Sequence, residues 1–242
     1  MGTSTVLWNR HAVALADFYR VLSFDLPGHG GTPSDILPDL APGSTRIEDL
    51  GRLVLDLVDQ YGAERFHYAG ISLGGAIGAH LAIHHPERVA SLAMVCSSAH
   101  FGPPEPWQDR AGLVRSSGTG PLLTVMPGRW FADPATATGV VGRSMLRNLA
   151  AAERAGYAAC CDALAGYDIT PELDRVTAPT LVIGGIYDVA TPMHHARELA
   201  DGIPRATLAA LATGHLAVED PGGLTAALRA HLRVADTMTE HG

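Results

Sequence analysis

Short apolar runs alternate with helical patterns along most of the chain. Residues 47–61 are predicted to form a helix, because their apolar side chains recur at i, i+3, i+4, i+7 and i+8. Further helices are expected at residues 8–16, 73–84, 193–200 and 222–234. The apolar runs predict strands at residues 20–25, 66–71, 90–96, 180–186 and 206–211. Such alternation is typical of an α/β fold, a mostly parallel sheet with helices on both faces.

Residues 105–166 interrupt this alternation. They contain no clear strand and are rich in Arg, Ala and Gly within helical stretches. We interpret them as a helical cap inserted into a discontinuous core made of residues 1–104 and 167–242. A chain of 242 residues suits one α/β domain with an insertion better than two independent domains.

The composition of the chain disfavours nucleic acids and membranes as binding partners. With 17 Lys plus Arg against 25 Asp plus Glu, the formal net charge is −8, which disfavours nucleic acid as a partner. No run of 18 apolar residues and no signal-peptide pattern is visible, so we expect no membrane association. The three cysteines are an odd count and two are adjacent, which favours a reducing cytoplasm over a disulfide framework.

Residues 70–74 read Gly-Ile-Ser-Leu-Gly and match the G-x-S-x-G pattern. The match falls between a predicted strand and a predicted helix, which is the context that a nucleophile on a sharp strand-to-helix turn requires. The helix N-terminus there favours developing negative charge. We therefore predict that Ser72 is a nucleophile; the alternative is a glycine-rich turn with an incidental serine.

A nucleophilic serine needs a base, and the base needs an acid to orient it. Asp188 directly follows the apolar run 181–187, and His215 follows the run 206–212. Both therefore lie just past strand ends, at the edge of the sheet that also carries Ser72. We predict that His215 takes the Ser72 proton and that Asp188 orients His215. Other acids are available, but none ends an apolar strand: Asp168, Glu172 and Asp174.

Most of the 12 histidines are expected to be structural or exposed. His194 and His195 are adjacent on a predicted helix, which is poor spacing for a metal site. His29 lies in a glycine-rich loop and is expected to be structural, and Cys160 and Cys161 are expected to be buried in a cap helix. We predict no metal and no other cofactor.

Several segments together carry a family resemblance. They are residues 25–32 (Asp-Leu-Pro-Gly-His-Gly-Gly-Thr), 70–74, 178–183 (Ala-Pro-Thr-Leu-Val-Ile) with 188, 214–215, 102–107 (Gly-Pro-Pro-Glu-Pro-Trp), 129–131 (Arg-Trp-Phe) and 156–161 (Gly-Tyr-Ala-Ala-Cys-Cys). The chain resembles the α/β-hydrolase superfamily in the first four of these segments, at residues 25–32, 70–74, 178–183 with 188, and 214–215. On the cap segments it resembles, within that superfamily, the 3-oxoadipate enol-lactonases.

The resemblance implies hydrolysis of a lactone ring by an acyl-enzyme mechanism, with a small-molecule lactone as substrate. It places the backbone N–H of Leu73 in the oxyanion hole. An acidic protein needs a local cation for the carboxylate of such a substrate, and we expect Arg129 to supply it, with Trp130 as an apolar wall. The alternative is that Arg129 pairs with a surface acid such as Asp133.

Members of the superfamily begin with strands before the first helix, and the loop after them supplies a second oxyanion N–H. These strands are expected to be absent here, so that Met1 stands where the second donor belongs. We favour a misassigned start codon over a chain that truly lacks these strands. A general carboxylesterase, a haloperoxidase-like hydrolase and an inactive remnant stay open as alternatives. The sequence does not predict the oligomeric state.

Overall fold

The computed structural model describes residues 1–239, which fall into two compact units. The first unit comprises Met1–Asp49 and Phe101–Tyr167, and the second comprises Leu50–His100 and Asp168–Gly242. The second unit contains the whole sheet, and the first contains the helices of residues 105–166. The division into a core and an inserted cap stays a prediction.

Four parallel strands form the sheet in the order β1-β2-β3-β4. Every residue of the two central strands is buried, whereas the edge strand β1 is only partly buried and β4 has only intermediate and exposed positions. The strands are β1 (Phe66–Ile71), β2 (Val89–Val95), β3 (Thr180–Gly185) and β4 (Ala206–Leu211). Both the parallel α/β class and the positions of these four strands were predictable from the apolar runs.

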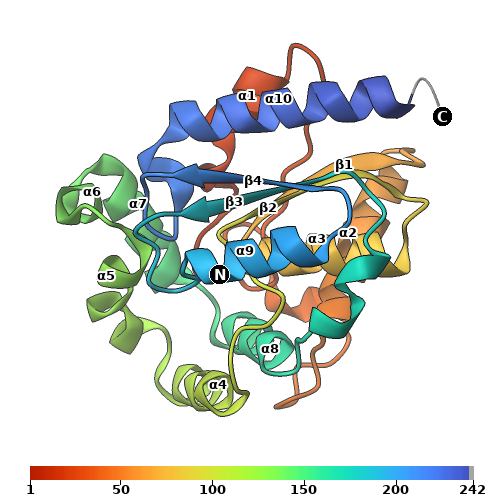
Figure 1. Cartoon of the computed structure of the whole chain (residues 1–242). Coiled ribbons are helices and arrows are strands. Elements are labelled where there is room, and N and C mark those ends of the chain that lie inside the picture. Colours follow the sequence, from red (N-terminus) through yellow and green to blue (C-terminus); the bar gives the residue numbers. More distant parts are fainter. Residues whose placement is uncertain (240–242) are drawn as a thin grey trace. The chain divides into compact units, whose positions relative to one another are not determined.

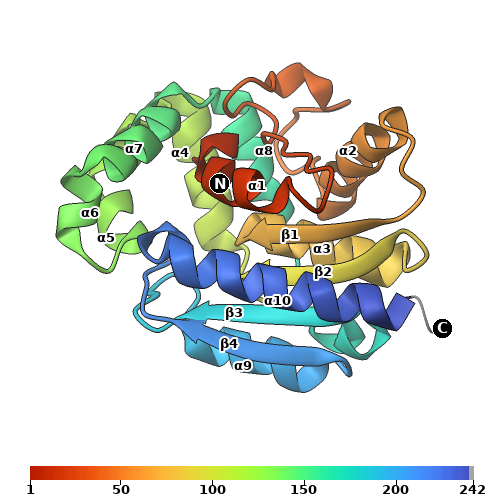
Figure 2. The same ribbon diagram turned by 90° about the horizontal axis from the view of Figure 1, so that it is seen from above.

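Helices cover both faces of this sheet. Figures 1 and 2 show α3 and α9 on one face and α10 on the other, in agreement with the strands that each helix contacts. The helices that contribute to this unit are α2 (Ile47–Gln60), α3 (Leu73–His84), α9 (Met193–Gly202) and α10 (Pro221–Thr239), with the short 3-10 helices η4 (Thr170–Arg175) and η5 (Ala217–Glu219). The Asp220 carboxylate accepts a hydrogen bond from the Gly223 N–H at 2.9 Å, which satisfies one of the free donors at the start of α10.

Helices also make up the regular structure of the first unit, within which α4 packs on α8 (Figure 1). They are η1 (Thr5–Leu7), α1 (Asn9–Leu15), η2 (Ser34–Ile36), α4 (Glu105–Ser117), η3 (Gly120–Thr124), α5 (Met126–Trp130), α6 (Pro134–Thr138), α7 (Val140–Ala151) and α8 (Arg154–Ala165). The first turn of α8 closely approaches another stretch of backbone: a Cβ on Gly156 would lie 2.3 Å from the Pro27 carbonyl oxygen, so this position requires glycine. Across residues 1–239, no helix combines the length and the hydropathy needed to cross a bilayer.

The strand predicted at residues 20–25 is wrong. This segment has no regular secondary structure, and the side chains of Val21 and Leu22 are each 36% exposed. A strand forms only where a neighbouring backbone completes its hydrogen-bond ladder. Within residues 1–239 no strand pairs with this segment, so a suitable apolar run stays irregular.

Two helical glycines offer a matched test of packing in the two units. A Cβ on Gly78 of α3 would lie 2.4 Å from Tyr68 Cδ1, whereas a Cβ on the exposed Gly112 of α4 meets nothing within 4 Å. We expect Gly78→Ala to lower the free energy of unfolding by about 1–3 kcal/mol through overpacking. Gly112→Ala should raise it by about 0.5–1 kcal/mol, because alanine favours the helix. Urea denaturation followed by circular dichroism measures both; equal effects of the two substitutions would contradict this packing.

Candidate active site

The candidate site lies where the carboxyl ends of the strands meet. In the register of the sheet, Ile71 pairs with Val95, and Val95 pairs with Ile183. Ser72 directly follows β1, while Asp188 and His215 follow β3 and β4 by a few residues each. Because parallel strands share one carboxyl edge, the three predicted catalytic residues leave the sheet on the same side.

Ser72 occupies a strained turn between β1 and α3. Its φ of 57° and ψ of −118° place a non-glycine residue in a region that side chains rarely adopt. The turn is tight enough that a Cβ on Gly70 would lie 2.2 Å from the Gly74 carbonyl carbon. A Cβ on Gly75, which lies outside the five-residue motif, would lie 2.6 Å from Ser97 Cβ. Gly70 and Gly75 are therefore the positions at which this turn requires glycine.

Two side chains that follow β2 contact backbone carbonyls of the Ser72 turn and of the loop that carries His215. The Ser97 hydroxyl donates to the Ser72 carbonyl at 2.8 Å. Its neighbour Cys96 directs its thiol toward the Gly214 carbonyl at 3.8 Å. The end of β2 thus holds both the turn and the histidine loop, with Gly214 immediately before His215.

The N-terminus of α3 provides N–H groups beside Ser72. The Ser72 side chain does not cap this helix, and the first N–H groups of a helix have no partner within it. Leu73 is the first residue of α3 and its side chain is fully buried, which fixes the direction of its peptide. This arrangement suits an oxyanion donor, and that role for Leu73 stays a prediction.

Asp188 and His215 are joined directly. Asp188 Oδ2 lies 2.9 Å from His215 Nδ1, and both residues are buried, at 4% and 7% exposure. Thr191 donates from its hydroxyl to Oδ2 at 2.7 Å and from its backbone N–H to Oδ1 at 3.0 Å. The Ala190 N–H also donates to Oδ1, at 2.7 Å, and is the third donor from this turn to the carboxylate. The carboxylate is therefore saturated with donors and holds one nitrogen of the imidazole.

These contacts decide the ionisation of Asp188. Burial alone would raise the pKa of this carboxyl, but the hydrogen bond and charge of His215 and the two hydrogen bonds from Thr191 outweigh it, so the pKa is lowered. An ionised acid that accepts a hydrogen bond from Nδ1 leaves the other imidazole nitrogen able to accept a proton.

Sequence reasoning missed two supporting residues. Thr191 sits three residues after Asp188, a spacing typical of an acid that caps a turn, so a local signal was available. Glu219 accepts a hydrogen bond from the Gly214 N–H at 2.6 Å and so anchors the histidine loop. No local pattern marks that second contact, because it depends on how the chain turns into η5.

The alternative acids have other partners. Asp168 accepts from the Thr170 N–H at 2.9 Å, and this hydrogen bond lowers the pKa of Asp168. Glu172 forms an ion pair with Arg175. Neither of these contacts involves His215, whereas Asp188 holds that ring directly.

His29 behaves as a structural residue. Burial lowers its pKa to about 4, its Nδ1 lies 2.9 Å from the Pro27 carbonyl, and its ring stacks on Tyr157. Cys160 and Cys161 are fully buried in α8, as the sequence predicted.

The remaining predicted residues belong to the first unit. Arg129 and Trp130 end the short helix α5; Arg129 is half-buried and Trp130 is 2% exposed. A Cβ on Gly2 would lie 3.1 Å from the Trp130 ring, so the N-terminal segment packs on that ring. Met1 places its sulfur 3.7 Å from the Cys161 thiol, and burial lowers the pKa of its amine. The substrate-binding and oxyanion roles of these residues stay predictions.

Comparison with known proteins identifies the family. The family model described as the alpha/beta hydrolase fold matches residues 1–117. A relative named 3-oxoadipate enol-lactonase 2, from Acinetobacter baylyi, is 33% identical over 96% of this chain and 86% of its own length. The chain belongs to the 3-oxoadipate enol-lactonase-like α/β-hydrolases.

Two solved structures agree with this assignment to the enol-lactonase-like α/β-hydrolases. The enol-lactonase from Burkholderia xenovorans LB400 has a TM-score of 0.89 and 31% identity, over 96% of this chain and 88% of its own. A thermophilic esterase from Thermogutta terrifontis, with malate bound, has a TM-score of 0.86 and 26% identity, over 96% and 86% of the two chains. The fold is thus that of a hydrolase, and the predicted fold class is confirmed.

The lowered pKa of Asp188 predicts how stability depends on pH. Its contribution is present above the ordinary carboxyl pKa of about 4 and is lost as the pH falls through the depressed folded value. We expect Asp188→Asn to lower the free energy of unfolding by about 2 kcal/mol at pH 7, with the gap closing below about pH 4. Urea denaturation across pH measures this. The exposed Asp39→Asn variant is the control, and a gap that stays constant with pH would contradict the ionised pair.

Proposed function

We propose that this chain opens the ring of 3-oxoadipate enol-lactone with water to give 3-oxoadipate. Ser72, His215 and Asp188 act as nucleophile, base and orienting acid in an acyl-enzyme mechanism. The observation that carries the proposal is the buried hydrogen bond between Asp188 and His215, at the sheet edge where Ser72 sits on its strained turn. Similarity to proteins named enol-lactonases supports the choice of substrate.

In the acylation half-reaction, Ser72 Oγ attacks the lactone carbonyl carbon and its proton passes to His215. The imidazolium that forms is stabilised by the Asp188 carboxylate. The N–H of Leu73 donates to the developing oxyanion, and Met1 is the proposed second donor. The ring C–O bond then breaks, and the departing enol oxygen takes the proton from His215. Because the ester is cyclic, both halves of the substrate stay on Ser72.

Deacylation repeats these roles with water as the nucleophile. His215 takes a proton from water, and the resulting hydroxide attacks the acyl carbon. The bond to Ser72 breaks and His215 returns the proton to Ser72 Oγ. The released enol tautomerises to a ketone, which favours the forward direction.

The substrate also carries a carboxylate that does not react. Arg129 binds it as a cation, and Trp130 lies beside it as an apolar wall. This assignment rests on the acidic net charge of the chain and on the resemblance of residues 129–131 to the enol-lactonases.

A general carboxylesterase is the second candidate, favoured by the similarity to the esterase from Thermogutta terrifontis. Assays of the purified chain with 3-oxoadipate enol-lactone and with a neutral aryl ester separate the two. Preference for the lactone supports the proposal, and turnover of the aryl ester alone supports the esterase. Turnover of neither would favour an inactive remnant.

Removal of the proposed nucleophile tests the mechanism. We expect Ser72→Ala to lower kcat for the lactone by roughly 10⁴-fold or more, because the covalent step is lost. Ser116→Ala, on the exposed face of α4, is the matched control and should keep the wild-type rate. Steady-state kinetics measures both, with circular dichroism to establish that each variant folds. Wild-type turnover by Ser72→Ala would overturn the mechanism.

The proposed carboxylate contact predicts a charge-selective effect. We expect Arg129→Ala to raise KM for the anionic lactone roughly tenfold, since a charge-assisted hydrogen bond is lost. KM for the neutral aryl ester should change little. Arg147→Ala on α7 controls for the general loss of a cation. Equal changes in KM for the two substrates would remove Arg129 from this role.

A further inference from the structure

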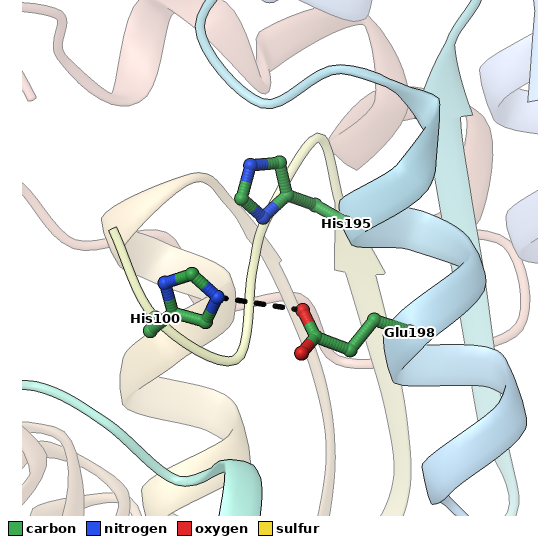
Figure 3. A group of neighbouring side chains, drawn as sticks. All are labelled: His100, His195 and Glu198. Atoms are coloured by element: carbon green, nitrogen blue, oxygen red, sulfur yellow. Dashed lines mark ion pairs between the residues drawn. The ribbon is translucent and has the colours of Figure 1, made fainter. Parts of the chain in front are cut away.

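Three side chains capable of binding a metal converge in the second unit, outside the candidate active site. His195 and Glu198 lie three positions apart on α9, a spacing that places both on one face of the helix. His100 reaches them from the segment that follows β2. Figure 3 shows the three side chains directed toward one another.

The distances between these side chains suit the binding of one metal ion. One potential ligand atom from each of the three residues lies within 4.8 Å of the other two. His100 Nε2 lies 3.7 Å from Glu198 Oε2, and the two imidazole rings are 5.5 Å apart between centroids. Ligands of a tetrahedral ion with bonds of about 2.1 Å lie about 3.4 Å apart, so small side-chain rotations close this group around an ion.

The cluster is held in place by its surroundings. Ser98 Oγ lies 2.7 Å from His195 Nδ1 and accepts the backbone N–H of His100 at 3.2 Å, so one hydroxyl holds the His195 ring and the backbone of His100. The Ser98 hydroxyl also contacts the His100 carbonyl. The Ile169 N–H fixes the same segment by donating to the Ala99 carbonyl at 2.9 Å. Because the Ser98 hydrogen bond occupies Nδ1 of His195, Nε2 is the nitrogen of that ring left to bind an ion.

Solvent can reach the cluster. The side chain of His100 is 38% exposed and that of Glu198 is 33% exposed, and His195 is half-buried. An ion can therefore enter, and water can complete its coordination. An ion pair between His100 and Glu198 would use only one of the two imidazoles, and two protonated imidazoles at this distance would repel each other.

We propose that His100, His195 and Glu198 bind a divalent transition-metal ion of the Zn²⁺ class. Ions of this class bind readily to two imidazole nitrogens and one carboxylate oxygen. Mg²⁺ and Ca²⁺, in contrast, favour oxygen ligands alone. The ion ties the segment after β2 to α9. Binding of the ion therefore stabilises the second unit, within which all three residues lie.

Titration of the untagged, full-length protein with ZnCl₂ by calorimetry tests the site directly. We expect one ion per chain, and no comparable heat with MgCl₂. With Zn²⁺ at about 100 times Kd, the melting temperature should rise by about 5 °C. Absence of Zn²⁺ binding to the wild-type chain would overturn the proposal.

Matched variants locate the ion. His100→Ala, His195→Ala and Glu198→Gln should each weaken Zn²⁺ binding about tenfold or more and, at the same Zn²⁺ concentration, reduce the rise in melting temperature by about half or more. His194→Ala removes the exposed histidine next to His195 and should leave Kd within about twofold. The near-isosteric Glu198→Gln guards against effects of misfolding.

The three buried cysteines are among the other potential metal ligands of the chain. They are unchanged in all four variants, so a Kd that stays at the wild-type value in every one of them would place the ion elsewhere. That result would overturn the assignment to His100, His195 and Glu198. Because the readouts are binding and melting temperature, they do not depend on the proposed lactonase activity.

Discussion

The common direction of the four strands is the constraint on which the site depends. Parallel pairing brings the carboxyl ends of β1, β3 and β4 to one edge, although Ser72 and His215 are 143 positions apart in the chain. No side chain has to reach far: each of Ser72, Asp188 and His215 leaves its strand within a few residues. The completely buried central strands supply the rigidity that keeps this edge in register.

Strain at that edge is distributed over two neighbouring strands. Ser72 and Cys96 both have positive φ, at 57° and 44°, immediately after β1 and β2. Such conformations cost of order 1–3 kcal/mol each and persist only where the surroundings hold them. Here the Ser97 hydroxyl holds the Ser72 carbonyl and the Cys96 thiol faces the Gly214 carbonyl, so side chains after β2 hold both neighbouring loops.

Local chemistry made much of this predictable, and long-range contacts account for the rest. The strands at 66–71 and 206–211 were placed to the residue, because apolar runs and turn residues mark both ends. The order Ser, Asp, His gave the pairing of Asp188 with His215. Pairing partners are not a local property, so the strand expected at 20–25 was wrong. The proposed metal-binding cluster was not predictable for the same reason: the sequence places His195 beside His194, whereas the ring of His100 comes from a segment 95 positions away.

The buried cysteines have a practical consequence for studying how the molecule opens. Cys160 and Cys161 lie in the first unit and Cys96 in the second, and all three are free thiols. Burial raises the pKa of Cys160 to about 12 and raises that of Cys96 as well, so none offers a thiolate to a reagent while its unit is closed. The labelling rate of each thiol therefore reports the opening of its own surroundings. The chain carries its own probes for deciding whether the two units unfold together or in turn.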